Sequence, residues 1–126
     1  MPVFIQSKTP YQGDVTPSAL NTETTVIEIT NQTDDCIVEG YISLRNLASG
    51  DTVVITEYIK VNGTDYDIYA QVTYSGAQTE PVIRFHAKTL INSGGRKNDY
   101  KVTIKQTAGS TIKTFPYSFL KELMGT

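Results

Sequence analysis

The residue types that usually carry catalysis or bind metals are few in this chain and far apart. His86 is the only histidine, and Arg84 and Lys88 lie two positions away on either side of it. In a strand these three side chains share one face, where two cations oppose protonation of the imidazole and repel a metal ion. Cys36 is the only cysteine, whereas a zinc site needs several His or Cys ligands. We therefore expect no metal site and no catalysis at these residues.

Cys36 is expected to serve as a small buried apolar residue. It is in phase with Val38, Ile42 and Leu44 in an alternating pattern, and free cysteines are among the most buried residue types. With one cysteine, the chain cannot form an internal disulfide.

Oxygen-bearing side chains gather at two turns. Asn62, Asp65 and Asp67 surround one of them, and Asp34 and Asp35 lie in another. A calcium loop would need regularly spaced acidic residues and a closing bidentate glutamate, which neither turn has. Turn formation alone explains these residues, because Asn and Asp side chains bond to nearby main-chain groups. We expect no bound cofactor or ion.

Paired carboxylates of the kind used in glycoside hydrolysis are not indicated either. Nothing distinguishes Glu57 or Glu80 from the other acids, except that Glu57 falls on an otherwise apolar strand face, as an edge residue or subunit contact would. The chain also lacks a G-x-S-x-G motif and a phosphate-binding loop. We expect that the protein is not an enzyme.

Three tyrosines, Tyr58, Tyr69 and Tyr74, are candidates for a surface on which sugar rings stack. Many sugar-binding sandwiches also present tryptophan, and this sequence contains none. A non-catalytic ligand-binding β-sandwich module, for instance one for carbohydrate, is therefore the alternative to the function favoured below.

Residues 51–74 predict a long β-hairpin around which the rest of the chain is organised. Asn62-Gly63 is a strong signal for a two-residue type I′ turn, which needs φ > 0 at both positions. Such a turn sets the register and places apolar residues opposite each other on one buried face. The predicted pairs are Ile59 with Tyr66, Ile55 with Ala70 and Val53 with Val72.

Alternating segments bounded by turn residues occur on both sides of this hairpin. They predict strands at 22–30, 36–44, 82–90, 100–106 and 111–119, with Gly40 marking a bulge or a close neighbour. About eight strands spaced 8 to 12 residues apart indicate an all-β fold. We predict an antiparallel β-sandwich of about eight strands, either jelly-roll or immunoglobulin-like, as a single domain over residues 22–126.

Residues 1–21 contain three prolines and little periodicity, and we predict that they form an extended N-terminal arm. The arm begins with an apolar cluster and is long enough to reach a neighbouring subunit. The competing arrangement adds the cluster to its own sheet as an edge strand. Together with the basic loop at 92–99, the arm supplies the predicted subunit contacts: Val3, Phe4, Ile5, Tyr11, Arg96 and Lys97.

Charge is unevenly distributed along the chain. Residues 1–80 contain eleven acidic and three basic residues, whereas residues 81–126 contain two acidic and eight basic residues. The two sets either pair within one sandwich or orient a head-to-tail contact between copies in a homo-oligomer. Nucleic acid is not an expected partner, because the whole chain is acidic and has no RNA-binding aromatic motif.

The sequence opens without a signal-peptide pattern and contains no apolar run of membrane-spanning length. We expect synthesis in the cytoplasm of a host, and no membrane partner.

The run LRNLASGDTVVITEYIKVNGTDYDIYAQVTYSG, continued by PVIRFHAKTL and YKVTIKQTAGSTIKTFPYSF, resembles small all-β structural proteins of tailed phages and archaeal viruses. The resemblance covers about residues 40–119 and implies a capsid, capsid-decoration or tail component located in the virion. Other virion proteins would be its partners. The sequence thus favours a structural or assembly protein that works through subunit contacts.

Overall fold

The computed structural model describes residues 4–125, with side chains for residues 7–124. Its elements are β1 (Phe4–Val15), β2 (Thr24–Ile29), β3 (Cys36–Ser43), β4 (Thr52–Ile59), β5 (Asp67–Ser75), β6 (Val82–Leu90), the short 3-10 turn η1 (Ser93–Gly95), β7 (Tyr100–Ala108) and β8 (Phe115–Gly125). Within this described part, no helix has the length and apolar character needed to cross a membrane.

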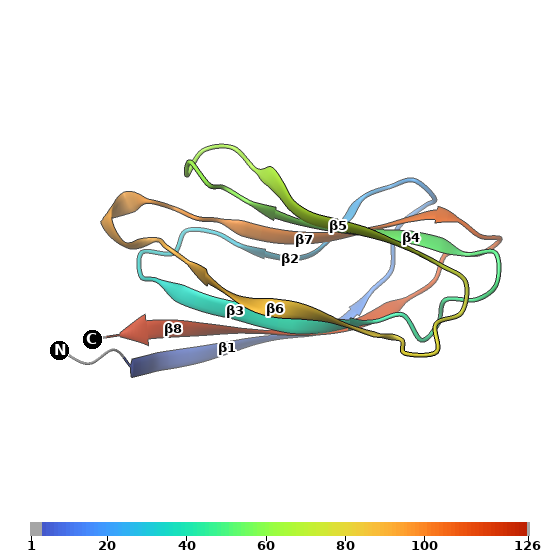
Figure 1. Ribbon diagram of the computed structural model, residues 1–126, viewed down its shortest axis with the longest axis horizontal. Helices are drawn as coiled ribbons and strands as arrows, with labels where there is room; N and C mark the ends of the chain where they lie inside the picture. The colour runs from blue at the N-terminus through green and yellow to red at the C-terminus, as the bar shows by residue number, and fades with distance from the viewer. Residues whose placement is uncertain (1–3, 126) are drawn as a thin grey trace.

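The strands form two four-stranded sheets that pack face to face (Figure 1). Sheet A has the order β1-β8-β3-β6 and sheet B the order β2-β7-β4-β5, with neighbours antiparallel throughout. The predicted antiparallel sandwich of about eight strands is confirmed. Consecutive strands alternate between the sheets, except for the β4–β5 hairpin within sheet B. An immunoglobulin-like order would instead place the first two strands in one sheet.

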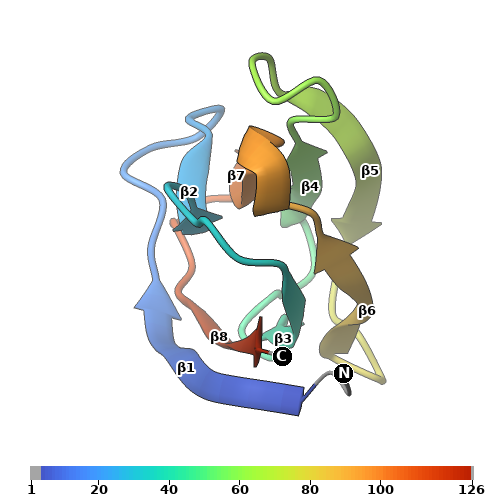
Figure 2. The same cartoon turned by 90° about the vertical axis from the view of Figure 1, so that its left-hand side faces the viewer.

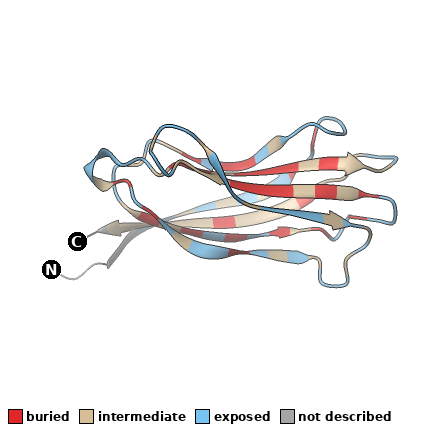
Figure 3. Cartoon of the chain, turned by 45° about the horizontal axis from the view of Figure 1, so that its top comes forward, coloured by how far each residue is buried: buried red, intermediate tan, exposed pale blue. Residues whose placement is uncertain are grey.

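The hydrophobic core lies between the sheets, and buried residues recur along strands of both sheets (Figure 3). Because successive strand residues point to opposite faces, buried and exposed side chains alternate along β3. Cys36, Val38 and Ile42 are fully buried there, whereas Tyr41 is half-exposed. Cys36 therefore packs as a small apolar residue, as predicted, and burial raises the pKa of its thiol.

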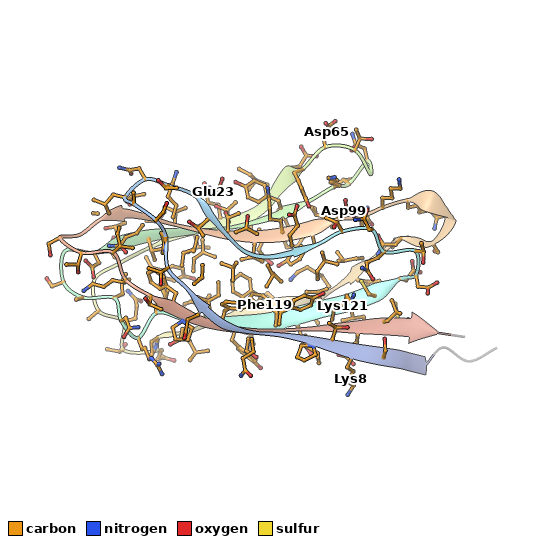
Figure 4. The ribbon with its side chains drawn as sticks, turned by 180° about the vertical axis from the view of Figure 1, so that it is seen from behind. Lys8, Glu23, Asp65, Asp99, Phe119 and Lys121 are labelled. Carbon is orange, nitrogen blue, oxygen red and sulfur yellow. The ribbon has the colours of Figure 1, made fainter. Side chains whose placement is uncertain are left out.

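Phe119 of β8 lies between the sheets, whereas Lys8 of β1 points away from them (Figure 4). The ring of Phe119 packs on Phe85, with ring centroids 5.1 Å apart. It also covers Gly40, its cross-strand partner, so closely that a Cβ there would overlap the ring. The prediction that Gly40 marks a bulge or a close neighbour is confirmed on both counts, since the β3–β6 register shifts between Val38 and Gly40.

The predicted hairpin exists, but its predicted register is wrong. Ile55 pairs with Val72 rather than Ala70, and the register shifts again after Glu57. The connecting loop is longer than two residues because Asn62 does not adopt positive φ, although Gly63 does, at 79°. Instead, Asn62 Oδ1 accepts hydrogen bonds from the main-chain N–H groups of Thr64 and Asp65, each at 2.9 Å.

Residues 4–15 of the predicted extended N-terminal arm follow the competing arrangement and join their own sheet. This segment is strand β1, which pairs with β8 along its length at the edge of sheet A. Val15 and Tyr11 pack against the core from this strand. Pro10 is tolerated because an edge strand needs hydrogen-bond donors on one side only. Phe4 and Ile5 thus add to their own sheet, opposite Gly125 and Met124. Val3 lies outside the described residues.

Candidate functional site: the open side of the sandwich

The two long sides of the sandwich differ in how they are closed. Strands β1 and β2 form one side, and β5 and β6 form the other (Figure 2). On the second side, a cavity of about 210 Å³ enters between the sheets. We call this the open side. Its cavity is lined by Ile55, Glu57, Ala70, Val72, Tyr74, Ile83, Arg84, Phe85 and His86.

Large apolar side chains are exposed on the two edge strands, and one of them, Val72, lines this cavity. Ile68, Tyr69 and Val72 of β5 are 59%, 53% and 48% exposed, and Val82 of β6 is 57% exposed. In the described part of the chain, β5 pairs only with β4, and β6 only with β3. Each strand therefore presents a row of unpaired main-chain groups beside an apolar surface. This combination favours strand pairing with another chain.

A polar cluster lies at the inner end of the cavity. The Lys88 Nζ atom is 3.0 Å from Glu57 Oε1 and 3.2 Å from the Tyr100 hydroxyl oxygen. The Tyr100 hydroxyl donates a hydrogen bond to the same carboxylate oxygen of Glu57. All three side chains are buried, and burial, followed by the charge of Glu57, raises the pKa of Tyr100. The cluster is thus a closed ion pair with its hydrogen bonds satisfied internally.

The position of Lys88 corrects the expectation that it shares an outer face with Arg84 and His86. The bulge between Val38 and Gly40 shifts the β3–β6 register, so that Lys88 pairs with Val38 and points inward. Arg84 and His86 remain exposed at the edge. The misfit of Glu57 on an apolar face was the sequence signal for this cluster, but its partner could not be identified without the bulge.

Two of the residues considered as metal ligands, Asp35 and Asn62, use a side-chain oxygen in main-chain hydrogen bonds. Asp35 Oδ1 accepts hydrogen bonds from the main-chain N–H groups of Asn92 and Ser93, at 2.9 and 3.0 Å. Asn62 Oδ1 accepts similar bonds within its own turn. Among the described residues, no group of three or more His, Cys, Asp or Glu side chains is arranged to hold a metal ion.

Most of the predicted subunit contacts lie at one end of the sandwich. The start of β1, the β4–β5 loop and the β6–β7 loop with Arg96 and Lys97 share this end (Figure 1). Both basic side chains are exposed there. Tyr11 is different, because it lies within β1 and packs partly buried against the core. The role of Arg96 and Lys97 in a subunit contact stays a prediction.

The two loops at this end are bound to each other. Asn98 Nδ2 donates a hydrogen bond to the Lys60 carbonyl oxygen at 2.8 Å, and Lys60 Nζ lies 3.1 Å from Asp99 Oδ2. The acidic and basic segments of the chain also pair within one sandwich through Lys88–Glu57 and Lys113–Asp51. Part of the charge asymmetry is therefore used inside the subunit.

Tyr58, Tyr69 and Tyr74 do not form the common face considered for sugar stacking. Tyr58 lies on the outer face of sheet B and donates a hydrogen bond to Glu23. Tyr69 lies at the bulge of β5, and Tyr74 lines the cavity between the sheets. A carbohydrate site built on these three residues is not supported.

Comparison with known proteins gives similarity in structure alone. No family model and no curated protein matches the chain. A chain from infectious bursal disease virus, Gt strain, is similar at 14% identity and a TM-score of 0.50, over 97% of this chain and 33% of that one. A chain from the T13 particle of the same virus gives 12% identity and 0.52, over 93% and 31%. This protein thus spans about a third of those viral chains.

A third solved structure is closer in size. It comes from Bacillus endospore appendages, described as a novel family of disulfide-linked pili, with 15% identity and a TM-score of 0.54 over 93% of this chain and 87% of that one. At these identities, the three likenesses establish the sandwich fold and nothing further. The single cysteine of this chain, Cys36, is fully buried and is therefore not positioned to form a disulfide with another subunit.

Proposed function

We propose that this protein is a structural subunit of a virus particle, as a capsid, decoration or tail component, and that copies of it assemble through the open side. The observation that carries this proposal is the combination of unpaired edges on β5 and β6 with exposed apolar residues on these two strands. Leaving such a surface in water is unfavourable, and a neighbouring subunit that covers it would gain both apolar burial and main-chain hydrogen bonds.

The strand directions suit such a contact in both sheets at once. Because β8 is antiparallel to β1 and β3, and β6 is antiparallel to β3, the edge strands β1 and β6 run in opposite directions. The same holds for β2 and β5 in sheet B. A second copy displaced sideways without rotation would meet the open side with β1 and β2, and both new pairs would be antiparallel.

The strand order supports a jelly roll, an architecture that occurs in viral capsid and lectin domains. The likeness to chains of infectious bursal disease virus particles agrees with a virion role. The proposal places the protein in the virion, in contact with other virion proteins. The proposed role is non-catalytic and involves no cofactor, membrane or nucleic acid.

A filament subunit is the second candidate. The pilus chain is similar over nearly its whole length, and a head-to-tail contact that does not close into a ring generates a filament. Sideways repetition of the edge contact is such a head-to-tail arrangement. The same subunit contact could then assemble copies either into a closed shell or into an open filament.

Two valine variants test the proposed interface. Val72→Lys places a charge on the open side, where the side chain is 48% exposed, and Val61→Lys places one in the β4–β5 loop, where it is 68% exposed. We expect that the full chain forms oligomers in light scattering and particles or filaments in electron microscopy. Val72→Lys should remain folded but become monomeric, whereas Val61→Lys should still assemble.

The other outcomes are also decisive. Loss of assembly in Val61→Lys alone would move the contact to the end that carries Arg96 and Lys97. A parent chain that stays monomeric at all concentrations would overturn the proposed function. Thermal unfolding of both variants is the control for a change in fold.

A further inference from the structure

The outer face of sheet A carries a groove that meets the open side only at Val82 of β6. One hollow of about 380 Å³ crosses the sheet and is lined by Gln12, Gly13, Asp14, Tyr41, Ser43, Val82, Pro116, Tyr117 and Ser118. A second hollow of about 130 Å³ is lined by Glu39, Gly40, Tyr41, Ser118, Phe119 and Leu120. Tyr41 and Ser118 border both hollows, so the two hollows meet at the Tyr41 side chain, which is 50% exposed.

The strand register explains how the groove forms. Tyr41 pairs with Ser118 on one side and Arg84 on the other, and Ser118 pairs with Gln12 on β1. A row across all four strands thus has a large aromatic side chain beside a serine. Ser43 provides a second small side chain in the neighbouring row, where it pairs with Val82. Small residues beside a large one leave a depression with an aromatic wall.

The polar groups of this groove are uncommitted, in contrast to those on the outer face of sheet B. There the Tyr58 and Tyr66 hydroxyls donate to Glu23 and Glu28, and Lys101 Nζ lies 4.9 and 4.6 Å from the centroids of the two tyrosine rings.

On sheet A, the side chains of Gln12, Asp14, Tyr41 and Ser118 form no hydrogen bond with any other described residue. They remain available to a ligand.

We propose that this groove binds a neutral saccharide. A pyranose ring has an apolar face of C–H groups that packs on an aromatic ring, and hydroxyl groups around its rim that need donors and acceptors. Tyr41 offers the ring, Val82 and Pro116 offer apolar contact, and Asp14, Gln12 and Ser118 offer the hydrogen bonds. A mostly apolar concavity with a few converging polar groups is the usual form of a small-ligand site.

The charges near the groove favour a neutral sugar over an acidic one. Asp14 lines the larger hollow and Glu39 the smaller, while Arg84 lies beside Tyr41 across the strand pair. Two carboxylates would repel an acidic sugar, and one guanidinium offsets only part of that repulsion. The groove meets the open side at Val82 of the edge strand β6, so ligand binding tests this site and oligomeric state tests the proposed assembly.

The test uses the intact chain and a panel of four methyl glycosides, those of glucose, galactose, mannose and N-acetylglucosamine, observed by saturation-transfer NMR. We expect at least one to bind, and Tyr41→Ala to weaken that binding about tenfold or more. The control is Val61→Ala, which removes an apolar side chain that is 68% exposed in the β4–β5 loop, outside both the groove and the open side. It should leave binding unchanged, whereas Asp14→Asn should weaken it.

Each contrary outcome overturns the saccharide site. Absence of binding by all four glycosides would do so, as would equal losses in Tyr41→Ala and Val61→Ala. If Tyr41→Ala instead dissociates an oligomer and no glycoside binds, the groove is occupied by a second copy. Oligomeric state is therefore measured for every variant, so that failure of this site is distinguished from failure of the proposed assembly.

Discussion

Glu57 and Lys88 face each other across the interior of the sandwich, with Oε1 and Nζ 3.0 Å apart. Glu57 belongs to β4 in sheet B and Lys88 to β6 in sheet A, so the ion pair joins the two sheets beside the open side. Their side chains are 12% and 7% exposed. A charge this far from water is stable only while its partner is present.

Glu57→Leu is therefore expected to destabilise the fold strongly. It leaves the Lys88 ammonium group buried without its counter-ion, and removing one partner of a buried pair costs about 3–5 kcal/mol. Urea unfolding of parent and variant, followed by circular dichroism, measures the loss.

Removing the whole polar cluster should cost much less. A triple variant with Glu57→Leu, Lys88→Met and Tyr100→Phe leaves no charge or hydroxyl in this cluster, and apolar replacement of a buried pair is often neutral or stabilising. We expect the triple variant to regain most of the stability lost by Glu57→Leu. If Glu57→Leu alone unfolds at the same urea concentration as the parent, Lys88 reaches water and the pair is not a buried one.

The hydrogen bonds of Asp35 are expected to stabilise the fold at neutral pH and to lose this contribution in acid. Its pKa is lowered, chiefly by the hydrogen bond from the Ser93 N–H group and then by the one from Asn92. The folded pKa thus lies below the ordinary value of 3.8, so the unfolded chain binds a proton more readily. The contribution is present above that value and is lost as pH falls through the folded pKa. Asp35→Asn should therefore be less stable than the parent at neutral pH, and the difference should shrink below about pH 4.

The measurement is a series of urea unfolding curves between about pH 7 and pH 2. Asp34→Asn is the matched control, because it removes the same charge from an adjacent exposed residue whose carboxylate does not bond to η1. A difference between parent and Asp35→Asn that stays constant over the whole range would show that the hydrogen bonds of Asp35 do not favour its charged form.

The sequence predicts the architecture well because the pattern behind it is local. Alternation such as that around Val38 and Ile42 marks a half-buried strand, and turn residues mark where each strand ends. The buried state of Cys36 and the close packing at Gly40 follow from the same local pattern. Fold class depends on these signals repeated along the chain.

Register could not be predicted, because it depends on bulges. The shift after Glu57 and the shift between Val38 and Gly40 each add one residue to one strand and reverse the faces beyond it. Lys88 consequently points inward, although its own segment predicts an outward position. A bulge is fixed by contacts with the partner strand, and these contacts cannot be read from either strand alone.

The open side and the groove around Tyr41 depend on strand order, which is a long-range property. Nothing local to Val72 or Val82 indicates that β5 and β6 end their sheets on the same side. Strand β1 was missed for a related reason, since Pro10 argues against a strand unless its place at an edge is known. The predicted arm and its crossing to a neighbour followed from that missing information.

Substituting alanine at Gly63 and at Gly94 distinguishes the cost of a left-handed backbone from the cost of a steric clash. Both have positive φ, 79° and 69°, which strains any residue with a Cβ. A Cβ at Gly94 would meet nothing within 4 Å, whereas one at Gly63 would lie 2.5 Å from the Arg96 carbonyl oxygen. Gly94→Ala should therefore cost about 1–2 kcal/mol, the strain alone.

Gly63→Ala should cost about 1–3 kcal/mol more than Gly94→Ala, because the β6–β7 loop must move away from the β4–β5 loop. That movement strains the hydrogen bond from Asn98 to the Lys60 carbonyl oxygen, which holds the two loops together. Urea unfolding gives the two costs, and faster amide hydrogen exchange in residues 60–66 and 92–99 of Gly63→Ala would locate the change. Equal costs for the two variants would mean that the loops separate freely and that Gly63 is required for its backbone conformation alone.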